Sequence, residues 1–226
     1  MAYLDGRESA TTVTPAGVVD QVLYEVNQEA IRRTSEYLVV HAAAASWRGR
    51  GLVFPAPMDS GKTTLVAGLI RAGLRYLTDE AALIGQGGTL HPYPKTLGLR
   101  PPSMEAIPEL QESLPPEFAW RSRLKYHVRP QDLRPRAIGR PCPVGYVIVP
   151  RYARGSPTVL ESLGRPEALM ELATNSFNLS SFGAEGLDLL AGVVKNAQCY
   201  KLSMGDLDGA VTMVLDLVRR RTRERR

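Results

Sequence analysis

The sequence predicts an α/β protein in which a mixed β-sheet, flanked by helices, surrounds one phosphate-binding loop. Three observations lead to this prediction. Residues 56–63 read Ala-Pro-Met-Asp-Ser-Gly-Lys-Thr and follow an apolar strand over 51–55. An apolar helix comes next, and a second strand over 75–78 ends in Asp79-Glu80. Strand and helix patterns then alternate toward the C-terminus, which predicts one domain over residues 1–226.

The loop at residues 56–63 has the residue types that bind a nucleoside triphosphate, taken here as ATP. Backbone N–H groups of such a loop wrap the phosphate chain, and the positive end of the following helix faces the same anion. Ala56 stands where these loops carry their first glycine, and a chance Gly-Lys-Thr at a helix start is the alternative. We predict that ATP and Mg²⁺ bind on Pro57, Met58, Asp59, Ser60, Gly61, Lys62, Thr63 and Thr64.

The acidic pair Asp79-Glu80 ends the second strand. Because the strands on either side of the helix form one crossover unit, they run parallel and end at the same edge of the sheet. The two carboxylates are therefore expected beside the loop. A magnesium-bound triphosphate needs a carboxylate on the metal or its water shell, and transfer to a hydroxyl benefits from a base. A solvated acidic turn is the alternative.

The remaining elements follow from hydrophobic periodicity and turn residues. Apolar residues recur on one face of each predicted helix, and Gly73 is expected to cap the helix that follows the loop. Helices are predicted over 17–34, 166–173, 187–196 and 206–221, and strands over 37–47, 144–150, 158–161 and 199–202. Residues 81–84 and 89–91 predict a hairpin, and residues 1–15 are predicted to be loose or a short strand.

Residues 100–143 are rich in proline and in basic residues, a composition typical of substrate-facing loops. Within this segment Arg121, Arg123, Lys125, His127 and Arg129 alternate with other residue types. The period of two predicts a strand with one basic face, suited to an acidic peptide or to nucleotide phosphates. Arg123 and Lys125 are therefore candidate substrate or phosphate contacts, and an edge strand guarded by charge is the alternative.

Three segments resemble the catalytic domain of the HPr kinase/phosphorylase family and its smaller relatives. They are residues 38–43, which place His41 before the loop, the loop itself, and residues 73–80, which end in the acidic pair. The turn His91-Pro92-Tyr93-Pro94-Lys95 is similar to a Pro-Lys turn of the small relatives. The match covers roughly residues 36–100. It implies a fold of the HPr kinase/PEP carboxykinase type and an ATP- and Mg²⁺-dependent serine/threonine kinase.

The resemblance also implies roles for individual residues. Lys62 and Thr63 would bind the phosphates and Mg²⁺, Asp79 would be the general base, and Glu80 would help to hold the metal. The family usually carries two aspartates here, so Glu80 leaves the division of roles open. His41 would lie close to the phosphates, or be a satisfied strand histidine. Lys95 would neutralise the transferring phosphoryl group, or be a solvated lysine.

The expected acceptor is a serine or threonine hydroxyl on a precursor peptide or protein. Residues 174–179 lack the arginine that HPr kinases carry after Asn-Phe, which argues against HPr as the acceptor and against phosphorolysis. The chain looks more like the small relatives of biosynthetic clusters, including the lasso-peptide precursor kinases. A kinase of a small hydroxyl metabolite such as a free amino acid is one alternative. A nucleotide-binding regulatory or scaffold protein with little turnover is another, and the family resemblance also suggests a homo-oligomer.

Composition and charge fit a cytoplasmic domain. The net charge of +5 equals the excess of six arginines over one glutamate in residues 219–226, so the rest of the chain is neutral. A basic tail could contact nucleic acid or an acidic peptide. No aromatic residues interleave with it, which argues against nucleic acid, and a solvated helix end is the favoured interpretation. No run reaches the length of a membrane helix, so no membrane partner is expected. Cys142 and Cys199 match no metal or redox spacing and are predicted to be buried thiols.

Overall fold

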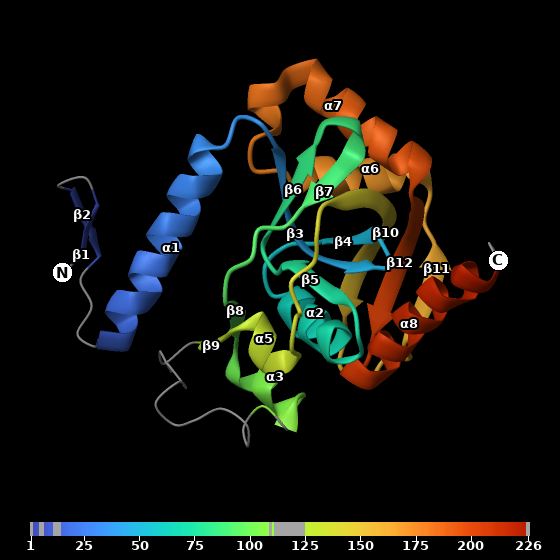
Figure 1. Ribbon diagram of the computed structural model, residues 1–226, viewed down its shortest axis with the longest axis horizontal. Coiled ribbons are helices and arrows are strands. Elements are labelled where there is room, and N and C mark those ends of the chain that lie inside the picture. Colours follow the sequence, from blue (N-terminus) through green and yellow to red (C-terminus); the bar gives the residue numbers. More distant parts are fainter. Residues whose placement is uncertain (1, 5–6, 11–14, 109, 111–124, 225–226) are drawn as a thin grey trace.

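The centre of the computed structural model is an eight-stranded mixed β-sheet with helices on both faces (Figure 1). The structure describes residues 2–4, 7–10, 15–108, 110 and 125–224. The strand order is β11-β12-β10-β4-β3-β6-β7, and β5 pairs with β3 as well. The strands are β3 (Leu38–Trp47), β4 (Arg50–Pro55), β5 (Arg75–Thr78), β6 (Ala81–Gly85), β7 (Thr89–His91), β10 (Cys142–Tyr152), β11 (Val159–Ser162) and β12 (Gln198–Met204). The predicted α/β class with a mixed sheet is confirmed.

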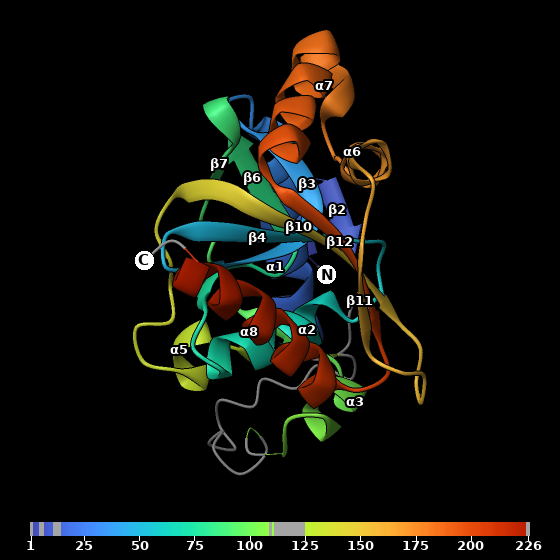
Figure 2. The same cartoon turned by 90° about the vertical axis from the view of Figure 1, so that its right-hand side faces the viewer.

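Helices cover both faces of this sheet. Figure 2 shows α2 and α8 on one face and α6 and α7 on the other. In Figure 1 α1 extends to one side of the sheet, and Ile31 near its C-terminal end packs against Val39 and Ala81. The helices are α1 (Pro15–Arg33), α2 (Lys62–Arg71), α3 (Pro101–Glu105), α5 (Pro130–Leu133), α6 (Arg165–Thr174), α7 (Leu179–Asn196) and α8 (Leu207–Glu224), with a 3₁₀ turn η1 (Gln86–Gly88). No helix in the described part of the chain is long and apolar enough to cross a membrane.

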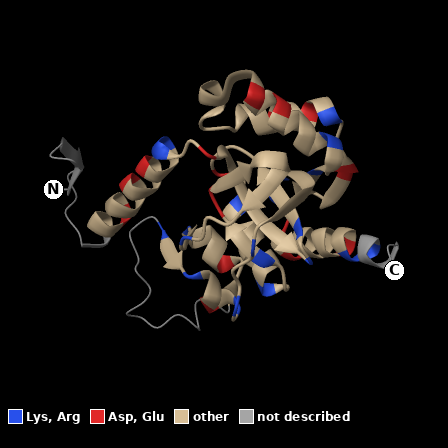
Figure 3. Ribbon diagram, turned by 45° about the horizontal axis from the view of Figure 1, so that its top comes forward, with Lys and Arg blue, Asp and Glu red and all other residues tan. Residues whose placement is uncertain are grey.

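Two small antiparallel pairs lie outside the central sheet. β1 (Ala2–Leu4) pairs with β2 (Arg7–Ala10), and β8 (Leu97–Leu99) pairs with β9 (Tyr126–Val128). Basic residues gather at the C-terminal end of α8, where Arg219 and Arg220 are exposed (Figure 3). Both cysteines are buried free thiols, as predicted, and burial raises the pKa of each.

Two predicted elements differ from the structure. The helix predicted from Leu187 is the second part of α7. A short first part begins at Leu179, and Gly183, with a non-helical φ of 54°, separates the two parts. The strand predicted across 121–129 is present only as β9. Residues 121–124, with Arg121 and Arg123, lie outside the described residues. Other predicted helices and strands are present with shifted ends, and Gly73 has the expected positive φ of 113°.

Strand directions decide which loops meet. β4 and β12 each pair in parallel with β10, whereas β3 pairs antiparallel with both β4 and β5. β4 and β5 therefore run in the same direction with β3 between them. The predicted strand–helix–strand unit is present, but its two strands are separated by an antiparallel neighbour.

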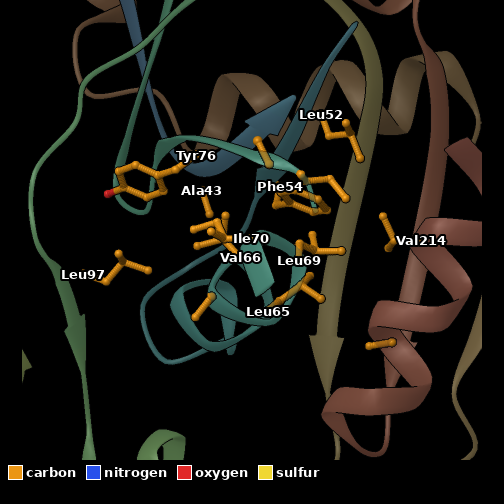
Figure 4. Packing of buried hydrophobic residues seen from close by; sticks show 14 of the residues in the cluster. Ala43, Leu52, Phe54, Leu65, Val66, Leu69, Ile70, Tyr76, Leu97 and Val214 are labelled. Carbon is orange, nitrogen blue, oxygen red and sulfur yellow. The ribbon is translucent and has the colours of Figure 1, made fainter. Parts of the chain in front are cut away.

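The alanines of β3 lie at the centre of the core. Side chains of a strand alternate between faces, so Ala43 and Ala45 contact the α2/α8 layer and Ala42 and Ala44 contact the α6/α7 layer. All four are completely buried. Figure 4 shows the apolar face of α2 directed at the sheet residues Ala43, Leu52, Phe54 and Tyr76. The helix that begins at Lys62 is thus held firmly against the strands on either side of the loop.

We expect the crossing of α2 and α8 to tolerate no side chain at Gly68. A Cβ at this position would lie 2.8 Å from Val211 Cγ2 and 3.0 Å from Leu207 Cδ1. Gly68→Leu should lower the free energy of unfolding by about 1–3 kcal/mol, measured by urea denaturation.

The matched control is Gly192→Leu in α7, because a Cβ there meets no heavy atom within 4 Å. This substitution should leave the free energy of unfolding unchanged or raise it by about 0.5–1 kcal/mol, since glycine is a poor helix former. Equal losses at the two positions would contradict a close-packed crossing.

Candidate functional site

A cavity of about 630 Å³ lies at the carboxyl ends of β4, β5, β10 and β12. These four strands share one direction, so the residues that follow them meet at one edge of the sheet, where α/β proteins bind ligands. The segments 58–65, 79–80 and 204–208 line the cavity, together with residues of β3, α3 and the turn after β10. The structure therefore brings the predicted loop and the predicted acidic pair into one cavity.

The loop over residues 56–61 connects β4 to α2. Its backbone enters the left-handed region twice, at Asp59 with φ of 64° and at Gly61 with φ of 84°. Ala56 is completely buried and is not among the residues with positive φ. The glycine that such loops usually carry at position 56 is therefore not required by this backbone, because the left-handed turns fall on other residues.

Lys62 begins α2 and is 6% exposed. Its Nζ donates hydrogen bonds of 2.7 Å to the carbonyl oxygens of Ala56 and Pro57. Burial lowers the pKa of Lys62 to about 8, against the opposing charges of Glu80, Asp59 and Asp79. An anion in the loop would offer this ammonium a stronger partner than two neutral carbonyls.

Asp79 and Glu80 lie at a break between β5 and β6, which both pair with β3. The Thr78 hydroxyl accepts hydrogen bonds from the backbone N–H of Glu80 at 3.3 Å and of Ala81 at 3.2 Å. The carbonyl of Glu80 accepts the N–H of Ala42 at 3.0 Å. The turn that directs both carboxylates into the cavity is thus fixed by hydrogen bonds on each side.

Lys95 bridges the two carboxylates. Its Nζ lies 2.9 Å from Asp79 Oδ1 and 3.1 Å from Glu80 Oε2. Burial lowers the pKa of Lys95, but the two carboxylates outweigh burial and raise it above its ordinary value. The structure therefore places Lys95 in the cavity, and its partners here are the acidic pair.

Tyr76 is a partner of Asp79 that the sequence analysis missed. Its hydroxyl donates to Asp79 Oδ1 at 3.0 Å, and burial followed by the charge of Asp79 raises the pKa of Tyr76 well above its usual value. The second oxygen, Asp79 Oδ2, accepts a long hydrogen bond of 3.4 Å from the N–H of Gly98. One carboxylate oxygen is therefore held by two strong donors, and the other is more weakly held.

Asn27 of α1 is the second missed residue. Its Nδ2 donates to Glu80 Oε2 at 3.1 Å, and the side chain is almost completely buried. Asn27 Oδ1 has no hydrogen-bond partner among the described residues. No signal in the sequence marked Asn27, because the apolar residues Val22, Leu23 and Val26 that the periodicity would bury are exposed, and the buried side of the helix carries Asn27 and Ile31 instead.

His41 lines the cavity from β3, and its ring packs on Phe177 with centroids 5.4 Å apart. Burial and then the charge of Lys62 lower the pKa of His41, against the opposing effect of Glu80, which favours the neutral ring. Thr63 and Thr64 also line the cavity. The Thr64 hydroxyl donates to Ser103 Oγ at 2.6 Å, which leaves Thr63 as the hydroxyl candidate for a metal.

The predicted basic face is only partly present. Lys125 lines the cavity, whereas His127 pairs with Asp20 of α1 and Arg129 pairs with Asp132. Arg123 lies outside the described residues. Two of the basic residues thus have carboxylate partners that a period-two pattern does not reveal.

A further basic contact crosses the loop. Arg100 Nη1 lies 2.7 Å from Asp59 Oδ1, and both side chains are substantially exposed. No pattern in the sequence marks Arg100 as a residue of the site. The pair joins the loop to the start of α3, on the open side of the cavity.

The oxygen atoms needed for Mg²⁺ are grouped in the cavity. The Thr63 hydroxyl and the carboxylates of Asp79 and Glu80 line it together. Within the described ranges no cluster of three or more His, Cys, Asp and Glu could hold a metal ion alone. Mg²⁺ at nucleotide sites characteristically uses one or two carboxylates together with substrate phosphates. The residues present fit that mode of binding.

No protein-family model matches the sequence, and no curated protein matches it. The resemblance to the HPr kinase family accordingly stays a prediction carried by the motifs in the sequence.

We expect the two lysines of the cavity to titrate in opposite directions from the ordinary lysine value of 10.5. In ¹³Cε-lysine NMR spectra the resonance of Lys62 should titrate with a midpoint near pH 8, because burial disfavours its charged form. The resonance of Lys95 should titrate above pH 10.5, because two carboxylates stabilise its charge.

The chain has five lysines, so Lys62→Arg and Lys95→Arg assign the two signals. An ordinary midpoint for Lys62 would mean that its amine is hydrated, contrary to the buried position described here.

Proposed function

We propose that this protein is an ATP- and Mg²⁺-dependent kinase that transfers the γ-phosphoryl group to a serine or threonine hydroxyl of a peptide or protein. The observation that supports this most is the shared cavity of Lys62, at the N-terminus of α2, and the acidic pair, at the end of β5. A lysine at a helix N-terminus suits a phosphate chain. Carboxylates opposite it suit a metal and an acceptor hydroxyl.

In this proposal residues 56–64 form a P-loop around the triphosphate. The first N–H groups of α2 lack acceptors within the helix and point toward the phosphates. Lys62 exchanges its bonds to the carbonyls of Ala56 and Pro57 for the β- and γ-phosphate oxygens. Because the pKa of Lys62 is about 8 without an anion, nucleotide binding near that pH takes up a proton.

The acceptor hydroxyl approaches on the side of Asp79. Its oxygen attacks the γ-phosphorus in line with the β–γ bridging oxygen, and the bond to that oxygen breaks as ADP leaves. Asp79 Oδ2 receives the hydroxyl proton, because Oδ1 is engaged by the Tyr76 hydroxyl and the Lys95 ammonium. Tyr76 and Lys95 thereby fix the orientation of the base.

Mg²⁺, when bound, would offset the charge of the β- and γ-phosphates. Thr63 and Glu80 are the residues that would hold it. The Glu80 carboxylate is oriented for this by Asn27 Nδ2 and by Lys95. This assigns Glu80 to the metal and Asp79 to the proton, which resolves within the proposal the division of roles that the sequence left open.

The peptide or protein acceptor follows from the resemblance to the precursor-peptide kinases. A small hydroxyl metabolite would use the same phosphate and base residues. A nucleotide-gated binding protein would use the phosphate residues alone. The acceptor and the need for Asp79 therefore separate these functions in one experiment.

We expect the protein to phosphorylate a peptide when it is incubated with Mg²⁺, γ-labelled ATP, a library of serine- and threonine-containing peptides, and free serine and threonine. Asp79→Asn should lower transfer by about 10²- to 10⁴-fold, the usual contribution of a general base, while ATP still binds. Asp188→Asn is the matched control, since Asp188 is exposed on α7, and it should keep full activity. Mass spectrometry locates the phosphate, and calorimetry measures ATP binding.

Label on free serine or threonine would replace the peptide acceptor by a metabolite. Full transfer by Asp79→Asn would remove Asp79 from the role of base. Absence of transfer to every acceptor, with tight ATP binding, would favour a nucleotide-gated binding protein.

A further inference from the structure

The cavity has a second wall, on the side of the loop away from the acidic pair. In the sheet β4 lies between β3 and β10, so β5 with Asp79 and β10 with Tyr152 end on opposite sides of the loop. The ends of β10 and β5 are three strand spacings apart, about 14 Å. Both ends nevertheless line the same cavity. A ligand that crosses the loop from one wall to the other is therefore an extended one.

We propose that the nucleobase of the triphosphate stacks on Tyr152, at the wall formed by the ends of β10 and β12. This inference rests on the proposed function, since it takes the γ-phosphate to lie beside Asp79. If the γ-phosphate is there and the remaining phosphates follow the loop, the nucleoside leaves the loop on the side of β10. Tyr152 is the aromatic side chain that the cavity presents on that side.

Tyr152 lies directly against the phosphate loop. A Cβ placed on Gly61 would be 3.6 Å from Tyr152 Cβ and 3.5 Å from Met204 Cε. Tyr152 is 54% exposed although it ends a strand whose central residues are buried. Met58, on the loop itself, is 71% exposed and also lines the cavity. Two exposed side chains with apolar surface thus line the cavity at the loop and at the end of β10.

The wall that carries Tyr152 is built rigidly. The N–H of Ala153 donates to the carbonyl of Met204 at 3.0 Å, and the N–H of Gly205 donates to Thr158 Oγ1 at 3.2 Å. A Cβ on Gly205 would lie 1.7 Å from the carbonyl oxygen of Ser156, so only glycine fits there. The turn after β10 is therefore locked onto the end of β12, and Tyr152 is positioned before any ligand arrives.

The chemistry of this wall suits a base and its sugar. A tyrosine ring offers a face for stacking, and the Arg154 guanidinium in the following turn can contribute a cation–π contact. The carboxylate of Asp208, in the first turn of α8, also lines the cavity and can accept hydrogen bonds from ribose hydroxyls. Stacking does not distinguish one base from another, so the subsite adds affinity for a nucleotide over bare phosphate.

Calorimetry with two ligands, Mg²⁺-ATP and Mg²⁺-tripolyphosphate, tests the subsite without reliance on catalysis. We expect Tyr152→Ala to weaken ATP binding by roughly 5- to 150-fold, the effect of removing one stacking partner. The affinity for tripolyphosphate should not change, because that ligand has no base. Tyr152→Phe should restore ATP binding, since it keeps the ring. Tyr24→Ala, at a tyrosine of α1 with a similar 55% exposure, should bind both ligands as the unaltered protein does.

Each other outcome overturns a specific part of the proposal. If the unaltered protein binds tripolyphosphate and Tyr152→Ala binds ATP with unchanged affinity, the phosphate site is supported and the stacking subsite is excluded. Equal loss of both ligands in Tyr152→Ala would make Tyr152 a support of the loop and not a partner of the base. Absence of binding of either ligand to the unaltered protein would overturn the proposed function itself.

Discussion

The cavity depends on the pairing of β3 along both of its edges. One edge of β3 pairs with β4, and the other pairs with β6 over Leu38–His41 and with β5 over Ala44–Ser46. Because both neighbours are antiparallel to β3, the ends of β4 and β5 point the same way, and the break at Asp79-Glu80 falls beside the loop. A slip of one residue in this pairing would exchange the two faces of the strand. The buried alanines of β3 are equally small on both faces, so their packing opposes such a slip only weakly. The hydrogen-bonded turn at Thr78 therefore helps to fix the register.

The two lysines of the cavity, Lys95 and Lys62, differ in how strongly their present partners hold them. Lys95 is bound to both carboxylates of the acidic pair, which would otherwise repel each other at close range. Lys62 is bound to neutral carbonyls and carries a lowered pKa. A bound anion therefore gains most from Lys62 and least from Lys95. In Asp79, Oδ1 is bound by the Tyr76 hydroxyl and the Lys95 ammonium, whereas Oδ2 is only weakly held and is the oxygen that we propose receives the proton.

Those parts of the site that are local in sequence could be predicted from it. The loop, the helix after it and the acidic strand end are contiguous patterns, and strand direction alone brings them together. Contacts between distant segments could not be predicted, because no local pattern records them. Asn27 of α1 donates a hydrogen bond to Glu80, and Asp20 of the same helix pairs with His127. The early start of α7 was missed because Gly183 interrupts the periodicity that marks a helix.

The strand order also has an entropic consequence. The strands and helix that hold Lys62 and the acidic pair all come from residues 38–85, whereas β10 and β12 return from 142–204 to complete the second wall. The entropy lost in closing a connecting segment grows only with the logarithm of its length, by about 0.6 kcal/mol for each doubling. Insertions or deletions between residues 100 and 141 that spare the packed positions would therefore change stability little. Within this fold the connection between residues 100 and 141 is therefore free to vary in length outside its packed positions, while the residues of the phosphate side stay together in sequence.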